Sequence, residues 1–531
     1  MIPLSTLCRE AAVKNRSSSD SASPETASET AAPSKAEARL YELWGELRDL
    51  RSVQEVLDWD QETYMPKKGT ASRALICGTI ASLHHRALTS NELWDVIDAC
   101  DEEAAEGSVL ASQVRVARRT AGRARCIPES LARAKAVARS RGTEAWQRAR
   151  AEADFSLFED ALVELVDLAK LEAAAVSPEG NPYDALIDRF EPGACEDELV
   201  PLFDSLVAEL SPMIRAVVED GRPVDESVVQ GHFPVDAQRR LAHHAAAAIG
   251  FDFDAGRLDA TAHPFCVGVT PSDVRLTWRW QEDDLRPGLY GVLHEAGHGV
   301  YEQGIPDAWH RTPIGTAVSL GIHESQSRLF ENHVGRSRGF WRWLWPTLIE
   351  HFPSMASRSI DDLWPALHTV KPSLIRVEAD EGTYNLHVAI RFQIERALFR
   401  GDLQVADLPG AWDDAYADLL GLRPQNAADG VLQDIHWSQA IFGYFPTYTL
   451  GNLAASQLYE AAGAELGDLE DAMARGEFQP LLQWMRKNIH SQASRYDAGE
   501  LIERATGKPR SPDALLTYLK STTEAVYGTT G

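Results

Sequence analysis

A chain of 531 residues with 44% hydrophobic and 25% charged residues has the composition of a soluble globular protein and the length to bury a large core. Its formal net charge of -27 and its pI of about 5.0 argue against nucleic acid or an anionic membrane as the main partner, because most of the surface would repel either polyanion. A local basic groove stays compatible with this charge, and an acidic surface also fits a salt-tolerant protein.

The six cysteines are scattered and form no CxxC pair, so the sequence indicates neither a disulfide framework nor a cysteine zinc site. We therefore expect a reducing, cytoplasmic environment. The N-terminus carries its positive charges after a short apolar patch, which is unlike a secretory signal.

The first 36 residues are expected to form a disordered tail, because residues 17–36 are rich in Ser, Ala, Thr and Pro and offer almost nothing to bury. Order is expected from near Ser34, which "SKAE" offers as an N-cap with Glu37 as its capping-box partner. The predicted helix continues with apolar residues at helical spacing, namely Leu40, Leu43, Leu47 and Leu50.

Helical patterns with acidic outer faces continue through most of the chain, without an internal repeat or a long Pro/Gly linker. They predict one large, mainly α-helical domain over residues 37–531. One example is "DFSLFEDALVELVDLAK", whose apolar stripe is interpreted as core and comprises Phe155, Phe158, Leu162, Leu165 and Leu168.

Two short strands are predicted in "FCVGVTPSDVRLTWRW", on either side of a Pro-Ser-Asp turn. Val274, Leu276 and Trp278 alternate with polar residues, which is the period of a strand with one buried face. Arg275 and Thr277 are interpreted as scaffold, with the strand edge free to pair with an extended substrate backbone. A small sheet should therefore lead into the helix that follows.

That helix carries "HEAGH", with His294 and His298 four residues apart and Glu295 beside the first. Residues four apart share a helix face, so both imidazoles can reach one tetrahedral zinc ion while Glu295 lies near a bound water. Such a zinc keeps an open position, lowers the pKa of its water and polarises a carbonyl, and the carboxylate can take the water's proton. The pattern can also arise by chance on a solvated helix face, so a metal site needs a third ligand.

The candidates for this ligand lie in "GIHESQSRLFENH". Glu324 follows His298 by 26 residues, a separation that lets a second helix cross the first and supply a carboxylate. Glu302 is too near on the first helix to close the same face. The rival candidates are His323, Glu331 and His333.

At this point the sequence resembles the carboxypeptidase Taq family of zinc metallocarboxypeptidases (peptidase family M32), over nearly the whole chain after the tail. Besides "HEAGH", the resembling segments are "LDWDQETYMP" (57–66), "YDALIDRFEPG" (183–193), "HPF" (263–265), "DVRLT" (273–277), "HESQ" (323–326), "IRVEADEGTYNLH" (375–387) and "GVLQDIHWSQAIFGYFPTYTLGN" (430–452).

The resemblance implies His294, His298 and Glu324 as zinc ligands and Glu295 as general base, with Co²⁺ as a substitute metal. It also implies a mainly α-helical, cleft-bearing fold similar to neurolysin and angiotensin-converting enzymes, with the small sheet beside the HExxH helix. The implied activity is that of a metal-dependent carboxypeptidase of broad specificity, usually a homodimer.

An enzyme that acts at a peptide C-terminus must recognise a free carboxylate, which a guanidinium does with two parallel hydrogen bonds. Arg376 is the first candidate, and Arg275 and Arg423 are alternatives. Arg376 could instead pair internally with one of three nearby carboxylates, Glu378, Asp380 or Glu381.

The run of residues 435–459 contains no Asp, Glu, Lys or Arg, but polar and helix-breaking residues interrupt it, so it is not a membrane-spanning helix. Within it, His436, Tyr444 and Tyr448 could form a cleft wall that offers donors to a developing oxyanion. They could equally be buried aromatic residues with satisfied polar groups.

We therefore predict a cytoplasmic zinc metallocarboxypeptidase that removes single residues from peptides with a free C-terminal carboxylate. Neither nucleic acid nor a membrane is expected as a partner. One rival hypothesis is an oligopeptidase on the same fold, which its larger products would distinguish. The other is a non-catalytic, metal-stabilised peptide-binding scaffold, against which the intact Glu295 argues.

Overall fold

The computed structural model describes residues 32–529, so most of the predicted tail lies outside the described residues. The start of the first helix is confirmed. Helix α1 (Lys35–Thr63) begins directly after Ser34, whose hydroxyl oxygen accepts the Glu37 N–H at 3.1 Å. The second half of the predicted capping box is wrong, because the Glu37 carboxylate accepts the Tyr41 hydroxyl at 2.6 Å instead. The division into a tail and one domain stays a prediction.

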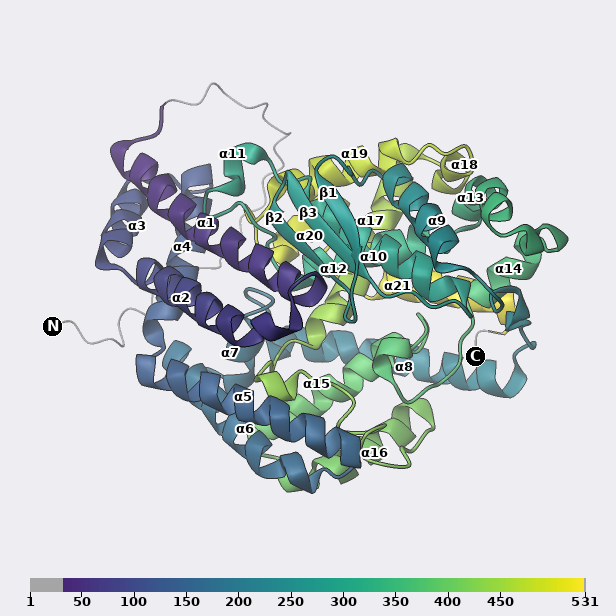
Figure 1. The fold of residues 1–531 in the computed structure, drawn as a ribbon, viewed down its shortest axis with the longest axis horizontal. Helices are drawn as coiled ribbons and strands as arrows, with labels where there is room; N and C mark the ends of the chain where they lie inside the picture. The colour runs from purple at the N-terminus through teal and green to yellow at the C-terminus, as the bar shows by residue number, and fades with distance from the viewer. Residues whose placement is uncertain (1–31, 530–531) are drawn as a thin grey trace.

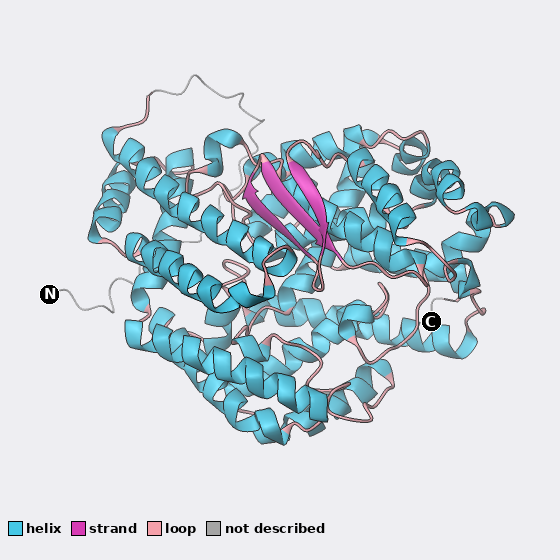
Figure 2. Ribbon diagram, viewed as in Figure 1, coloured by secondary structure: helices cyan, strands magenta, loops and turns pink. Residues whose placement is uncertain are grey.

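The described chain is mainly helical, as predicted, with one small sheet (Figure 2). Its apolar residues gather in three clusters. The smallest lies among the N-terminal helices, at the left of Figure 1, and includes Leu40 and Leu47 of the predicted stripe. These helices are α1, α2 (Thr70–Leu88), α3 (Asn91–Glu103) and α4 (Val109–Cys126).

A second cluster fills the lower part of the molecule in Figure 1. It contains the stripe predicted from Phe155 to Leu168, of which Leu162 and Leu165 are fully buried. Its helices are α5 (Glu129–Glu152), α6 (Ser156–Val176), α7 (Pro182–Ile187), α8 (Glu196–Asp220), α15 (Tyr384–Arg400), α16 (Leu408–Leu420) and α21 (Asp513–Tyr527).

The third cluster lies under the sheet and around the helix that carries "HEAGH". Its helices are α9 (Val235–Ala248), α10 (Leu285–Glu302), α12 (Leu320–Arg328), α13 (Arg338–His351), α14 (Ile360–Leu367), α18 (Leu469–Ala474), α19 (Gln479–Asn488) and α20 (Ala498–Thr506); the short α11 (Asp307–His310) precedes α12.

The sheet has three strands in the order β1-β3-β2, one more than predicted. The predicted hairpin is confirmed, because β2 (Phe265–Thr270) pairs antiparallel with β3 (Asp273–Trp278). The additional strand β1 (Gly256–Ala260) pairs parallel with β3 on its other side. Since β3 is the central strand, its edge is not free for a substrate, and that part of the prediction is wrong. The scaffold interpretation holds for Thr277, which is fully buried and bonds the backbone of Phe265.

Helix α17 (Pro446–Leu466) joins the two larger clusters. Leu450 and Leu453 belong to the lower cluster, whereas Ala454, Ala455 and Leu458 belong to the upper one. This helix contains most of the uncharged run, so the absence of charge there reflects burial inside the protein. Within residues 32–529, none of the helices combines the length and the apolarity that crossing a bilayer requires.

Candidate metal centre

Helices α10 and α12 bring the three predicted ligands together. His294 and His298 project from one face of α10, and their Nε2 atoms lie 3.7 and 3.4 Å from Oε2 of Glu324 on α12. One donor atom from each residue lies within 4.8 Å of the others. Two imidazoles and one carboxylate are a donor set that suits a catalytic zinc ion, and the spacing leaves room for one ion among them.

The second nitrogen of each imidazole is already engaged. His294 donates from Nδ1 to Glu331 at 2.8 Å, and His298 donates from Nδ1 to the backbone oxygen of His323 at 3.0 Å. These bonds fix the tautomer that leaves both Nε2 atoms free to bind a metal. Burial, with a smaller effect of His323, lowers the pKa of His298 to about 3, so this imidazole is neutral. The described residues therefore fit a divalent metal.

Two glycines allow the helices to approach this closely. A Cβ at Gly297 of α10 would lie 2.5 Å from the backbone oxygen of Gln326 on α12. A Cβ at Gly451 of α17 would lie 2.6 Å from the side chain of Glu324. The glycine inside "HEAGH" therefore has a packing role, because it lets α12 place its carboxylate beside both histidines.

The rival ligands have other partners. Glu331 lies on a π-helical turn (Leu329–Val334) and accepts the hydrogen bond from Nδ1 of His294, on the side of the ring away from Nε2. His323 stacks on the imidazole of His298, with 4.3 Å between ring centroids, and pairs with Glu302 at 2.9 Å. His333 bonds the Ser456 hydroxyl at 3.0 Å.

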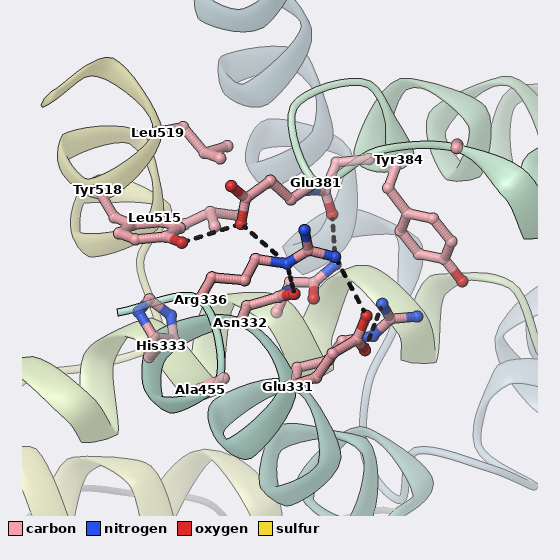
Figure 3. Close-up of a pocket in the computed structure, with 14 residues that line it drawn as sticks. Glu331, Asn332, His333, Arg336, Glu381, Tyr384, Ala455, Leu515, Tyr518 and Leu519 are labelled. Atoms are coloured by element: carbon pink, nitrogen blue, oxygen red, sulfur yellow. Dashed lines mark hydrogen bonds and ion pairs between the residues drawn. The ribbon is translucent and has the colours of Figure 1, made fainter. Parts of the chain in front are cut away.

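Glu331 is also the start of a chain of polar contacts behind the metal centre (Figure 3). Arg336 lies 3.6 Å from Glu331 and 3.9 Å from Glu381. The Tyr518 hydroxyl donates to Glu381 at 2.9 Å. The carboxylate that orients His294 is therefore itself held by a buried network.

Glu295 is buried beside the ligands, and burial raises the pKa of its carboxyl to about 7. A carboxyl with a pKa near neutrality can both accept and return a proton. Such a group, one residue from His294, has the position and the acidity that a general base needs.

Arg376 is buried and already paired. Its Nε and Nη2 donate to Oδ1 of Asp434 at 3.0 and 2.8 Å, and its Nη1 donates to Tyr384 at 3.1 Å. The internal pairing that we weighed is therefore present, but with Asp434 and not with Glu378, Asp380 or Glu381. The other oxygen of Asp434 accepts from Nε of Arg391 at 2.9 Å.

The two alternative arginines lie elsewhere. Arg423 is exposed and pairs with Asp414 at 2.8 Å on the surface, so the structure does not bring it to the site. Arg275 pairs with Asp273 and lies over the ring of Trp59. Of the three candidates, only Arg376 is in contact with the predicted aromatic wall.

The structure brings His436, Tyr444 and Tyr448 together, and their role as donors to an oxyanion stays a prediction. The Nε2 atom of His436 lies 3.2 Å from the Tyr448 hydroxyl, and burial lowers the pKa of His436 to about 4. The rings of Tyr444 and Tyr448 are 5.2 Å apart, and Arg376 lies 4.9 Å from the ring of Tyr448. Burial, together with the Glu324 carboxylate, raises the pKa of Tyr444 to about 12, so its hydroxyl keeps its proton.

Sequence reasoning missed Asp434 and Arg391. Arg391 is fully buried on α15, within the mostly apolar run "VAIRF", and Asp434 directly precedes the uncharged run. A charged residue that interrupts an apolar run was the available signal, because a buried guanidinium requires a partner.

Comparison with known proteins agrees with this geometry. A family model described as carboxypeptidase Taq (M32) metallopeptidase matches residues 39–523. The chain is 44% identical over 513 residues to thermostable carboxypeptidase 1 of Thermus thermophilus, covering 93% of this chain and 100% of that protein. It is 36% identical over 493 residues to carboxypeptidase 1 of Bacillus subtilis, covering 92% and 98%.

Solved structures give the same result. The M32 carboxypeptidase from Deinococcus radiodurans R1 has a TM-score of 0.90 and 37% sequence identity, covering 93% of this chain and 100% of that one. The family, the fold class and the metal-dependent carboxypeptidase function predicted from the sequence are thus confirmed, and nothing supports the non-catalytic scaffold. The chain belongs to the carboxypeptidase Taq (M32) family of metallopeptidases and is a metal-dependent carboxypeptidase.

Proposed function

We propose that His294, His298 and Glu324 hold a zinc ion, with Co²⁺ as a substitute, and that Glu295 is the general base. The supporting observation is the convergence of three donor atoms whose histidine partners leave both Nε2 atoms free. A metal bound there would supply Lewis acidity, which polarises a scissile carbonyl and makes water more acidic.

The side chains around this centre have separate roles in proton transfer and in binding the oxyanion. The Glu295 carboxylate takes the proton of the attacking water and passes it to the leaving amine. With its proton on Nε2, His436 donates to the Tyr448 oxygen at 3.2 Å, which leaves the Tyr448 hydrogen for the developing oxyanion. Tyr444, whose ring lies beside that of Tyr448, offers a second hydroxyl donor.

We infer that the terminal carboxylate of the peptide binds at Arg376. Arg376 and Arg391 both donate to Asp434, so two guanidinium groups share one carboxylate in a buried place. The neighbouring His436 is neutral, because burial lowers its pKa to about 4. An incoming carboxylate would balance the excess positive charge of this cluster, and buried charges are favoured when they are paired. Released products would then be single C-terminal residues, with little selection among their side chains.

The first experiment compares wild type with Glu295→Gln. We expect both proteins to hold about one metal per chain and only wild type to release free amino acids from an unblocked peptide, with activity reduced about 10²- to 10⁴-fold in the variant. Amidation of the peptide C-terminus should abolish release by wild type. Equal release from the amidated peptide, or larger fragments as products, would favour an oligopeptidase.

We further propose a cytoplasmic homodimer, from the family and from the cysteines. Within the described residues, Cys77, Cys100, Cys195 and Cys266 form no disulfide, which suits a reducing compartment. Light scattering on the purified protein tests the dimer, since a monomer mass across the working concentration range would contradict it.

A further inference from the structure

A cleft of about 480 Å³ leads away from the metal centre. It is lined by α1, by β2 and by residues 189–192 and 316–320. His323 lines it, and the ring of His323 stacks on that of the proposed ligand His298 at 4.3 Å. Phe190 also lines the cleft and meets the ring of Tyr444 edge-on, with 5.0 Å between centroids. The cleft is therefore next to a proposed ligand and to a proposed oxyanion donor.

Five groups follow one another from the proposed carboxylate site into this cleft. They are Arg376, Tyr448, Tyr444, Phe190 and Arg189, with successive separations of 4.9, 5.2, 5.0 and 5.0 Å. The two guanidinium groups are therefore at most about 20 Å apart, which is the reach of about six extended residues. A peptide held at Arg376 and running along this row would bring a residue upstream of the cleaved bond to Arg189.

The guanidinium of Arg189 is available to a ligand. Among residues 32–529 it has no hydrogen bond or ion pair, and its recorded contact is with the ring of Phe190. Its side chain is exposed on the cleft wall, where partial loss of solvent and the charge of Arg139 lower the pKa of Arg189. An unpaired cation in such a place lacks the counter-charge that a carboxylate would supply.

The carboxylates nearby are already engaged. Asp188 accepts from Arg119 at 3.1 Å and from Arg123 at 3.4 Å, so it serves two cations. Arg119 also lines the cleft, and its Nε atom is buried without an acceptor among the described residues. This wall thus has an excess of positive charge, although the whole protein carries -27.

The opposite wall offsets part of this excess, through Asp58. Glu55 pairs with Arg51 at 3.0 Å and with Arg48 at 3.7 Å, both on its own helix α1. Glu302 pairs with His323 at 2.9 Å. The acidic residues across the cleft are therefore matched by cations beside them, apart from Asp58, which accepts from Gln54 at 2.6 Å.

We propose that the cleft binds the peptide segment upstream of the released residue and that Arg189, supported by Arg119, selects substrates with an acidic side chain in that segment. This rests on the proposed function, since it takes the direction of the peptide from the carboxylate site at Arg376. A guanidinium binds a carboxylate with two parallel hydrogen bonds, and a concave wall with an excess of positive charge attracts anionic ligands.

The test uses peptides that share one C-terminal residue and differ at a single upstream position, which carries Glu, Gln or Lys. That position is moved in turn through the five residues before the C-terminal one, and kcat/KM is measured from the released amino acid. At the favoured position we expect Glu to exceed Gln by about fivefold, the upper range for a solvent-exposed ion pair, with Lys lowest. The preference should shrink at high salt.

Variants of Arg189 separate this selection from a structural effect. Arg189→Lys should keep the order, and Arg189→Glu should reverse it, so that Lys exceeds Glu. The matched control is Arg475→Gln, which removes an exposed arginine that pairs with Asp471 and Glu477 on the surface. It should keep the wild-type order.

The outcomes distinguish this inference from the proposed function. Equal kcat/KM for the three peptides at every position overturns the proposed selection. Release of the C-terminal amino acid in that experiment still supports the carboxypeptidase mechanism. An unchanged order in folded Arg189→Glu overturns the role of Arg189. If wild type shortens none of the peptides, the proposed function is wrong, and the inference that rests on it is overturned as well. If Arg189→Glu does not fold, two results still test the inference. They are the wild-type peptide series and the Arg189→Gln variant, which should lose the preference for Glu over Gln.

Discussion

At the scale of single residues, Glu331 has a role that its neighbours explain. It accepts the Nδ1 hydrogen of His294 at 2.8 Å and is held by Arg328 at 3.2 Å. We predict that Glu331→Gln lowers metal affinity by about 10- to 100-fold, because a neutral amide oxygen is a weaker acceptor than the carboxylate and no longer raises the basicity of the imidazole. Competition with a chelator of known affinity measures this. Glu378→Gln, at an exposed position, is the control and should bind metal like wild type. Equal affinities of both variants would show that His294 needs no such partner.

The convergence of His294 and His298 could be predicted from the sequence, because a separation of four residues on a helix fixes a shared face. The function of Glu331 could not. It depends on a π-helical turn after Arg328, which changes the direction in which the next side chains point. The partner of Arg376 was also beyond local reasoning, because Asp434 lies 58 residues further along the chain. Contacts between residues so far apart in the sequence follow from tertiary packing and leave no periodic pattern in the sequence.

At the scale of elements, the crossing of α10 and α12 sets the geometry of the centre. Gly297→Ala should force the helices apart, because the new Cβ would lie 2.5 Å from backbone on α12. We expect the free energy of unfolding to fall by about 1 to 3 kcal/mol, together with weaker metal binding, as measured by urea unfolding and metal titration. The control is Gly410→Ala on α16, where no atom of residues 32–529 would lie within 4 Å of the new Cβ, and there alanine should stabilise by about 0.5 to 1 kcal/mol. If Gly297→Ala behaved like this control, close approach would not explain the glycine.

A second element-scale prediction concerns the loop before α17. Glu395 of α15 accepts from Tyr183 at 2.8 Å, from Trp437 at 2.8 Å and from the backbone of Gly443 at 2.9 Å, so it anchors the loop that carries His436. Burial raises the pKa of Glu395 from 4.5 to about 7. An acid whose folded pKa is raised stabilises the fold less as pH rises between these values, because the buried site resists ionisation.

We therefore expect this group to remove up to about 3 kcal/mol of stability between pH 5 and pH 8, a loss that Glu395→Gln should lack. Urea unfolding at both pH values gives the difference for each protein. The amide meets three donors, so the variant can be less stable throughout, and only the pH difference is diagnostic. Glu500→Gln, an exposed replacement on α20, should keep the wild-type difference. If Glu395→Gln kept it too, the Glu395 carboxyl would not ionise in this range.

The sequence also predicted these elements unevenly. The hairpin of β2 and β3 was evident, because alternation and a Pro-Ser-Asp turn are local signals. Strand β1 was not, since "GRLDA" has no alternation of β-branched residues and becomes a strand by pairing with β3. Context of this kind overrides weak strand propensity.

At the scale of the whole molecule, the protein is acidic, whereas its proposed binding regions contain buried or unpaired arginines. The protein carries a net charge of -27, but Arg376 and Arg391 share one carboxylate and the cleft wall carries the unpaired Arg189. Helix α17 joins the two larger apolar clusters, so the proposed ligands on α10 and α12 and the proposed carboxylate site come from different cores. Repulsion between surface carboxylates is the global cost of this arrangement, and it leads to a prediction about salt.

At pH 7.5, raising NaCl from about 0.05 to 0.5 M should raise the Tm, because the Debye length shortens to a few ångströms and screens the repulsion. At pH 5, near the pI of about 5.0, the net charge is small and the same salt should change the Tm little. Calorimetry at both pH values makes each condition the control for the other. An equal rise at both would mean that salt acts by strengthening apolar burial, which does not depend on net charge. A rise confined to pH 7.5 would assign the effect to surface carboxylates, and the acidic composition would then fit a protein that gains stability in salt.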